Sequence, residues 1–316
     1  MQATVNEAIS LALTEEMRRD PRVVMFGEGV ATKRADLVKA FGARRVRNTP
    51  LAEGIITGTA VGAAATGLRP VVDLLFAPFL CYAMDGIVNS AGKLRYISGG
   101  QFSFPLVVMT TTGGGWGVGA QHNHNIEAWF VHSPGLKVVM PSTPEDARGP
   151  LKSAIRDENP VMFFTDMALG YQKGEITDAD HSIPLGQACV RRAGRDVTIV
   201  SYGQAVQSCV EASQKLEAMN VSAEVIDLRT LKPLDEATIL ASVRKTGRLA
   251  IVHEASGMCG VGAEVAALVS EKAFRALKGP IVRLTGPDAP APASAVLEQA
   301  FMPQAEAIMS AVRKLL

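Results

Sequence analysis

Residues 46–73 read VRNTPLAEGIITGTAVGAAATGLRPVVD, a run of small and apolar residues that predicts a helix followed by a strand. Thr49 is a plausible N-cap, and Pro50 suits the first helical turn. Gly67 is typical of a helix end, and the apolar run Val71–Leu75 after it predicts a buried strand. A helix followed closely by a buried strand indicates parallel α/β structure.

Three glycines, Gly54, Gly58 and Gly62, recur every four residues along this predicted helix. Residues four apart lie on one face of a helix, and glycine adds no side chain to that face. Another backbone can therefore come very close to the helix on this side.

Glu53 is the only acid in the predicted helix. A carboxyl among apolar neighbours tends to have a raised pKa, which suits proton transfer. An acid in the first turn of a helix is also commonly no more than a favourable partner of the helix dipole. Residue type alone leaves both interpretations of Glu53 open.

The composition indicates a large globular protein. The 316 residues suit two medium-sized domains, and 47% hydrophobic with 20% charged residues excludes a disordered chain. A net charge of +1 argues against binding to nucleic acid or to a membrane surface. Abundant glycine with only 5% aromatic residues favours close-packed parallel α/β layers over a β-sandwich.

The chain carries no sequence signal for export or for a membrane span. Its four cysteines, at positions 81, 189, 209 and 259, lie far apart and match no zinc spacing, so they read as reduced thiols. No apolar run reaches the length of a membrane helix, and the first residues lack the apolar core of a signal peptide. We therefore expect a cytoplasmic protein.

Strands and helices alternate in two blocks that a weaker stretch separates. We expect an α/β chain of two parallel-sheet domains, residues 1–175 and 194–316, joined by a linker at residues 176–193. The pattern also predicts two long uninterrupted helices, Pro78–Tyr96 and Ser294–Leu315.

Residues 113–125 read GGGWGVGAQHNHN and follow a strongly apolar strand. So many glycines predict a loop whose backbone approaches something closely, although neither a Walker loop nor a dinucleotide fingerprint is present. His122 and His124, with Glu127 and His132 nearby, could alternatively be ligands of a metal-dependent hydrolase or oxygenase. That alternative needs the four side chains to converge.

Several segments together closely resemble one enzyme family. They are TPLAEGI at 49–55, AQHN at 120–123, EAWF at 127–130, PGLKVV at 134–139, AIRDENP at 154–160, DLRTLKPLD at 227–235 and HEA at 253–255. These segments resemble the β subunit of the thiamine-diphosphate-dependent 2-oxo acid dehydrogenases, the E1 component, over nearly the whole chain. The resemblance implies a transketolase-like pyrimidine-binding domain followed by a transketolase C-terminal domain.

The family also implies roles for individual residues of this chain. Glu53 would bond N1′ of the aminopyrimidine ring of thiamine diphosphate, with Leu51, Phe79 and Tyr82 as further cofactor-binding residues. His122 would lie at the mouth of the active site and assist acyl transfer. A carboxylate on N1′ needs a water-poor cleft, and the apolar surroundings of Glu53 suit that requirement.

A potassium site is a second implication of the resemblance. The turn at residues 154–160 resembles the potassium-binding turn of the family. Its ligands would be the backbone carbonyls of Leu106, Ala154, Ile155, Asp157 and Asn159. Hard oxygen donors suit a hard cation, although the same residues also fit a helix end closed by an Asx turn.

A missing motif bears on the partners. The family holds the diphosphate and Mg²⁺ with a Gly-Asp-Gly segment, and none occurs in this chain. The resemblance therefore implies an α subunit that carries the diphosphate and Mg²⁺ half of the site, in an α2β2 heterotetramer with a β–β dimer. A lipoyl acyltransferase would be a further partner.

The substrate stays open because this chain departs from the family near the substrate side. Tyr82 stands where pyruvate-type enzymes have Gln, Met109 where Arg is frequent, and His124 where Gln is common. The expected reaction is cleavage of a 2-oxo acid or acetoin, with transfer of the acyl unit to a lipoyl or other acceptor. The alternatives are a two-component carboligase or lyase without a lipoyl complex, and a non-catalytic interaction subunit.

Overall fold

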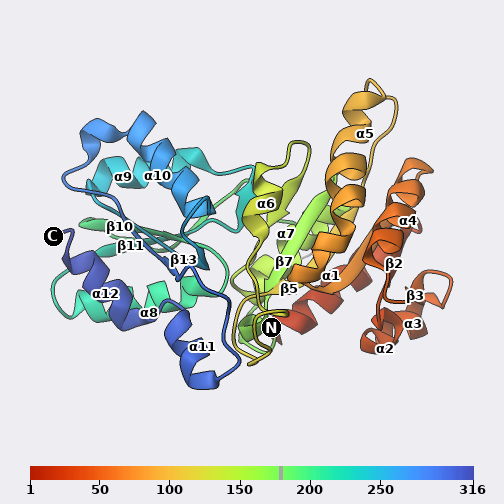
Figure 1. Cartoon of the computed structure of the whole chain (residues 1–316), viewed down its shortest axis with the longest axis horizontal. Coiled ribbons are helices and arrows are strands. Elements are labelled where there is room, and N and C mark those ends of the chain that lie inside the picture. Colours follow the sequence, from red (N-terminus) through yellow and green to blue (C-terminus); the bar gives the residue numbers. More distant parts are fainter. Residues whose placement is uncertain (178–180) are drawn as a thin grey trace.

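The computed structural model describes residues 1–177 and 181–316, which form two α/β halves side by side (Figure 1). In these residues the first sheet has the order β12-β6-β7-β5-β4-β2-β3, parallel throughout except that β12 runs antiparallel to β6. Its strands are β2 (Val23–Gly27), β3 (Val46–Asn48), β4 (Arg69–Phe76), β5 (Val107–Thr112), β6 (Lys137–Val139), β7 (Val161–Asp166) and β12 (Thr230–Lys232).

The second sheet has the order β14-β13-β10-β11-β9, and only the edge strand β9 is antiparallel in the described residues. Its strands are β9 (Cys189–Arg192), β10 (Val197–Ser201), β11 (Ala223–Asp227), β13 (Leu249–Ser256) and β14 (Val282–Gly286). A small antiparallel pair, β1 (Gln2–Thr4) and β8 (Lys173–Glu175), ties the N-terminus to the end of the first half.

Helices cover both faces of the first sheet, so its strands are buried on both sides. Val71 packs in the core beneath α1 (Val5–Arg19) and α7 (Pro144–Arg156), whereas the next residue, Val72, packs beneath α4 (Glu53–Ala65). The other helices of this half are α2 (Val30–Lys33), α3 (Ala35–Phe41), α5 (Gly92–Ile97) and α6 (Glu127–His132). The second half contains α8 (Ala205–Glu217), α9 (Glu236–Thr246), α10 (Val261–Lys272), α11 (Ala295–Phe301) and α12 (Ala305–Arg313).

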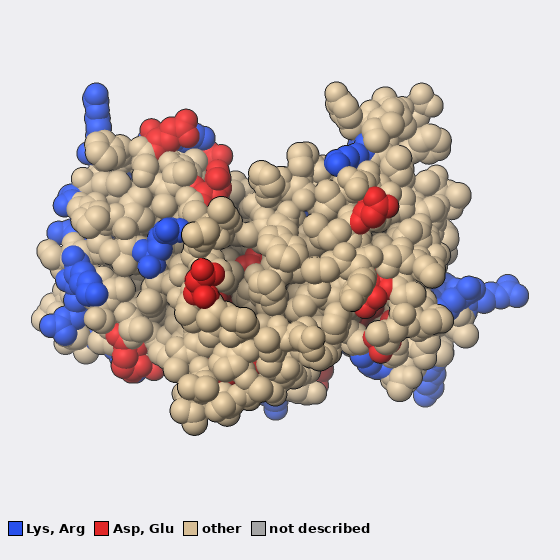
Figure 2. All heavy atoms as spheres, in the orientation of Figure 1, with Lys and Arg blue, Asp and Glu red and all other residues tan. Residues whose placement is uncertain are grey.

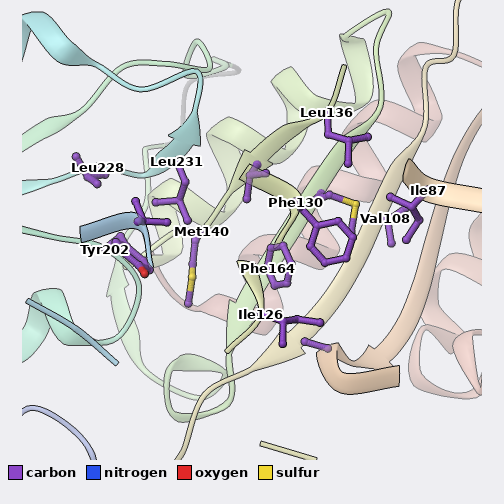
Figure 3. Close-up of a cluster of buried hydrophobic side chains, with 14 of the residues drawn as sticks. Ile87, Val108, Ile126, Phe130, Leu136, Met140, Phe164, Tyr202, Leu228 and Leu231 are labelled. Atoms are coloured by element: carbon purple, nitrogen blue, oxygen red, sulfur yellow. The ribbon is translucent and has the colours of Figure 1, made fainter. Parts of the chain in front are cut away.

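The two halves share one hydrophobic core (Figure 3). Phe130 and Phe164 of the first half lie with ring centroids 5.8 Å apart. Tyr202 and Leu231 of the second half belong to the same buried cluster, and β12 pairs directly with β6. The shared core and shared sheet fix the position of one half relative to the other.

The expected α/β fold of two sheets, mostly parallel, is confirmed, but the start of α4 differs from the sequence prediction. The helix begins at Glu53 with Ala52 as its N-cap, so the prediction of Thr49 as N-cap is wrong. The amide of Thr49 donates instead to the Gly27 carbonyl at 3.0 Å, which continues the pairing of β3 with β2. Pro50 disfavours helical geometry in the residue before it, so Thr49 stays extended and continues the strand pairing.

The two long predicted helices are also interrupted. The segment predicted as Pro78–Tyr96 consists of a 3₁₀ helix, η1 (Ala77–Ala83), a π-helical stretch, η2 (Asp85–Ala91), and then α5. The C-terminal helix is divided into α11 and α12 at Pro303, because proline cannot continue a helix hydrogen-bond ladder. Two short 3₁₀ turns, η3 (Met167–Leu169) and η4 (Phe274–Ala276), complete the elements of the described chain.

The domain boundaries at residues 175 and 194 stay a prediction. Residues 178–180, within the predicted linker, lie outside the described residues, and β9 begins inside that linker, at Cys189. Among the helices that are described, none is long and apolar enough to cross a membrane.

Buried acids gather where the two halves meet. A side chain at Gly113, whose φ is +76°, would come within 2.5 Å of Asp166 Oδ1 and 3.2 Å of Glu254 Oε2. Both oxygens are buried, and neither has a hydrogen-bond partner in the described part of the chain. Burial, reinforced by the charges of Glu127 and Glu298, raises the pKa of Glu254 to about 7, and burial next to Glu254 raises the pKa of Asp166.

These acids predict that neutral to alkaline pH destabilises the domain interface. Between the ordinary carboxyl pKa and pH 7, Glu254 binds a proton in the folded chain but not in the unfolded chain. Its contribution to stability is therefore complete below that window and is lost as the pH rises to about 7. Glu254→Gln, which removes the group that ionises, should raise the melting temperature by at least about 3 °C at pH 8 and change it little at pH 5.

The control is Glu271→Gln, which removes an exposed acid of the same half. Differential scanning calorimetry at both pH values separates the two variants. Equal shifts at pH 5 and pH 8 for Glu254→Gln would contradict a titrating interface.

Candidate active site

Glu53 is the first residue of α4, and its side chain is half-buried. The Thr57 hydroxyl donates to the Glu53 carbonyl at 2.8 Å, which closes the first turn. A side chain at Gly54 would come within 3.0 Å of the Tyr82 carbonyl, so α4 and the end of η1 nearly touch here. The close backbone approach expected from the glycines therefore occurs at Gly54.

The other two glycines of the series face open space. A side chain at Gly58 or Gly62 would meet nothing within 4 Å, and both residues are exposed. The glycine-lined face of α4 is thus uncovered in the single chain.

Apolar side chains around Glu53 are also uncovered. Leu51 is 64% exposed, Ile55 73% and Tyr82 75%. Soluble proteins rarely leave so many large apolar side chains in water near one acid unless something covers them. In the view of Figure 2, few charged residues lie over α4 and α5.

His122 lies against two phenylalanine rings. Its ring centroid is 5.0 Å from that of Phe76 and 5.3 Å from that of Phe79, both in edge-to-face geometry. The structure thus brings together two of the predicted residues, His122 and Phe79. Phe76, at the end of β4, was missed because a phenylalanine that ends an apolar strand carries no signal for a site.

The glycine-rich loop before His122 is held by two acids from the second half. The Gly114 amide donates to Glu254 Oε1 at 2.6 Å, and the Gly117 amide donates to both oxygens of Glu298 at 3.1 and 3.2 Å. Asn123, next to His122, also donates to Glu298, at 3.2 Å. The close approach predicted for this loop is therefore made to carboxylates, and it fixes the residues beside His122.

The histidines proposed for a metal site do not converge. His122 contacts phenylalanine rings, and the ring centroid of His124 lies 5.8 Å from that of Trp129. Glu127 is buried and accepts a hydrogen bond of 2.7 Å from the Tyr202 hydroxyl. Within the described ranges, no group of three or more His, Cys, Asp or Glu side chains could hold a metal ion.

Four of the five carbonyls predicted to bind potassium already accept hydrogen bonds within the chain. Arg69 Nη1 donates to the Ile155 carbonyl at 3.0 Å and to the Asp157 carbonyl at 3.1 Å. The Leu106 carbonyl accepts from the Val161 amide at 2.8 Å, and the Ala154 carbonyl accepts from the Asp157 amide at 3.3 Å. The guanidinium of Arg69 therefore supplies a positive charge at this turn.

Comparison with known proteins places this geometry in a family. Residues 1–171 match the family model of the transketolase pyrimidine-binding domain, and residues 186–308 match that of the transketolase C-terminal domain. The 2-oxoisovalerate dehydrogenase subunit beta of Bacillus subtilis (strain 168) is 43% identical over 98% of this chain and 97% of its own. The chain belongs to the E1 β subunits of 2-oxo acid and acetoin dehydrogenases.

Further relatives support the same membership. The mitochondrial pyruvate dehydrogenase E1 component subunit beta of Caenorhabditis elegans is 44% identical over 98% of this chain and 92% of its own. The Acetoin:2,6-dichlorophenolindophenol oxidoreductase subunit beta of Bacillus subtilis (strain 168) is 40% identical over 100% of this chain and 96% of its own. The family is thiamine-diphosphate-dependent, so the expected resemblance and the enzyme class are confirmed.

A solved structure also matches this E1 β subunit along its length. It is a split-gene transketolase described as an inactive β4 tetramer, with a TM-score of 0.83 and 28% sequence identity. The match covers 99% of this chain and 98% of that one. The transketolase-like fold is therefore confirmed by structure as well as by sequence.

Glu298→Ala should loosen the glycine loop of this E1 β subunit. The substitution removes the acceptor of the Gly117 amide and of Asn123, so peptides covering residues 113–125 should exchange hydrogen about tenfold faster. Glu298→Gln keeps one acceptor oxygen and should give a smaller effect. Unchanged exchange in Glu298→Ala would show that the loop does not depend on this carboxylate.

Proposed function

We propose that this chain is the β subunit of an E1-type enzyme that cleaves a 2-oxo acid or acetoin and passes the acyl unit to a lipoyl or other acceptor. One observation carries this proposal more than any other. A half-buried acid begins α4 and is surrounded by uncovered apolar side chains, in a chain from a thiamine-diphosphate-dependent family. Such surroundings fit a cofactor ring that a carboxylate must contact away from water.

Glu53 is the residue proposed to act on the cofactor. When bound, thiamine diphosphate supplies a nucleophilic carbon and accepts the electrons of the broken carbon–carbon bond. The Glu53 carboxyl would hold a proton at N1′ of the aminopyrimidine ring and so select the tautomer needed for the reaction. Its position at the N-terminus of a helix fixes the carboxyl on a rigid element.

Four further residues have proposed roles around this acid. Leu51, Phe79 and Tyr82 would pack against the pyrimidine ring, and His122 would assist acyl transfer at the mouth of the site. The contact of His122 with Phe76 and Phe79 supports its role, because the two rings restrict where the imidazole can point. The hold of Glu298 on Asn123 restricts the loop in the same way.

A partner α subunit is proposed to supply the rest of the site. This chain has no Gly-Asp-Gly segment, so the diphosphate and Mg²⁺ would be held by α. The uncovered glycine face of α4 and the exposed Leu51, Ile55 and Tyr82 support a tight contact with another chain. The split-gene transketolase is itself inactive as a β4 tetramer, which agrees with a need for a second chain type.

The proposed assembly is an α2β2 heterotetramer that contains a β–β dimer, with a lipoyl acyltransferase as a further partner. Potassium is proposed at the 154–160 turn, where the Asn159 carbonyl would add to those of Leu106, Ala154, Ile155 and Asp157. Because Arg69 already donates to two of these carbonyls, a potassium ion would have to share them with the guanidinium of Arg69.

Glu53→Gln tests the catalytic assignment against the helix-dipole interpretation. With the α subunit, it should lose activity by about two orders of magnitude or more, because the amide cannot supply the same proton. Glu236→Gln is a matched control, since Glu236 is likewise the first residue of a helix, α9. The measurement is steady-state turnover beside melting temperature and assembly by size-exclusion chromatography.

The outcome separates two interpretations. If Glu53 only stabilises the helix dipole, both variants should retain turnover and lose about 0.3–1 kcal/mol of stability. A Glu53→Gln complex that assembles and turns over like the native one would exclude the proposed role of Glu53.

The acceptor is tested separately, because a two-component carboligase stays the alternative. Tyr82 stands where pyruvate-type enzymes have Gln, and His124 stands where Gln is common in the family, which keeps this alternative open. The α2β2 complex should reductively acylate a free lipoyl domain faster than it joins the same acyl unit to an aldehyde. Carboligation with no acylation of the lipoyl domain would favour the alternative.

A further inference from the structure

Strand β4 contains one extra residue just before its end. Asp73 pairs with Met109 of β5, whereas Phe76, three residues later, pairs with Thr111, which is only two residues after Met109. An additional residue in one of two paired strands is a β-bulge, and a bulge re-aims the side chains that follow it. Paired residues point to the same face of a sheet, so Asp73 and Phe76 share a face, which an odd spacing in a regular strand would not allow.

The bulge contains a residue in a strained conformation. Leu75 has a φ of +57°, which costs free energy in a residue with a side chain and persists only where the surroundings hold it. Two side chains do so. The Leu75 amide donates to Asp73 Oδ1 at 3.0 Å, and the Thr110 hydroxyl donates to the Leu75 carbonyl at 3.2 Å. Both polar groups of the Leu75 backbone therefore have a side-chain partner.

Phe76 follows the bulge and lies against His122. The centroids of these two rings are 5.0 Å apart, with an angle of 89° between the ring planes. Phe79 completes the cluster, at 6.4 Å from Phe76 and 5.3 Å from His122 between ring centroids. No hydrogen bond to the imidazole of His122 is found in the described part of the chain, so the two phenylalanine rings are the contacts that restrict its orientation.

Asp73 could instead serve only to balance positive charge. Lys33 Nζ lies 4.0 Å from Asp73 Oδ2. Burial lowers the pKa of the Arg34 guanidinium, and the charge of Asp73 opposes that change. Charge balance needs a carboxylate, whereas the hold on Leu75 needs only an acceptor oxygen. An asparagine at position 73 keeps the acceptor and lacks the charge, so it separates the two purposes.

We propose that Asp73 is a positioning residue for His122. Its Oδ1 holds Leu75 at positive φ, the bulge turns the ring of Phe76 toward His122, and that ring restricts the imidazole. Asp73 thus acts through Leu75 and Phe76 without contacting His122. The consequence for turnover rests on the acyl-transfer role proposed above for His122.

Nuclear magnetic resonance of the full-length chain, labelled at histidine Cε1, tests the positioning without turnover. The chain has five histidines, and His122→Asn identifies the signal of His122. Asp73→Ala should displace this signal in the same direction as Phe76→Leu, because each change alters the aromatic ring beside the imidazole. Asp73→Asn, which keeps an acceptor for the Leu75 amide, should leave the signal at its native position.

A double-mutant cycle tests whether Asp73 acts through Phe76. In the Phe76→Leu background, Asp73→Ala should add little to the displacement of the His122 signal, since the ring that transmits the effect is gone. Asp196→Ala is the matched control, because Asp196 also accepts a backbone amide, that of Ser222 at 2.8 Å, but in the second half. It should leave the His122 signal unchanged.

Three results would overturn the proposal. They are a native His122 signal in Asp73→Ala, a signal in Asp73→Asn as displaced as in Asp73→Ala, and equal effects of Asp73→Ala with and without the Phe76 ring. If Asp73→Ala fails to fold, Thr110→Val removes the other hydrogen bond to Leu75 and should displace the signal in the same direction. A native signal in Thr110→Val would then show that the ring does not depend on the hold on Leu75.

Turnover of the complex with α tests the consequence for function. Asp73→Ala should slow acylation of a free lipoyl domain at least about tenfold, because a small misplacement of an acting group lowers the rate steeply. Substrate cleavage followed with a soluble dye as electron acceptor should change by less than about twofold, because that assay does not need acyl transfer. A displaced His122 signal with native acylation would contradict the role proposed for His122, while the positioning by Asp73 would stand.

Discussion

Carboxylates from the second half of the chain hold the backbone of the glycine-rich loop in the first half, and the candidate active site depends on this contact. Glu254 accepts from the Gly114 amide, and Glu298 accepts from the Gly117 amide and from Asn123. A loop with so many glycines loses much conformational entropy on folding, so contacts within the loop alone are not enough to order it. Hydrogen bonds to carboxyl oxygens of a neighbouring domain can order it, and the loop then leads to His122, which lies against Phe76 and Phe79.

This arrangement also explains why the two halves share a core and a strand pairing. Carboxylates can hold the loop only if the second half keeps a fixed position relative to the first. The pairing of β12 with β6 and the buried cluster of Phe164, Tyr202 and Leu231 provide that position. The buried pair Asp166 and Glu254 opposes it once both acids ionise, so the same contact that orders the loop makes the interface sensitive to pH.

The sequence could predict the strands of both halves, because each is a short apolar run between helical segments. It could also predict the closeness of a backbone to Gly54, since small residues at regular spacing leave room for one. It could not predict where α4 begins, because the Thr49 amide pairs with Gly27, a partner that only the folded sheet provides. The interruptions in the segments 78–96 and 294–315 depend on packing and on proline positions that helical periodicity alone does not reveal.

The site shows the same division between local and tertiary information. Glu53, Phe79 and His122 stood out because a family resemblance assigns them, whereas Phe76 and Glu298 carry no pattern of their own. Phe76 matters most here, because its ring contacts His122. The positive φ of Leu75 and the register shift between Asp73 and Phe76 turn the chain just before this ring.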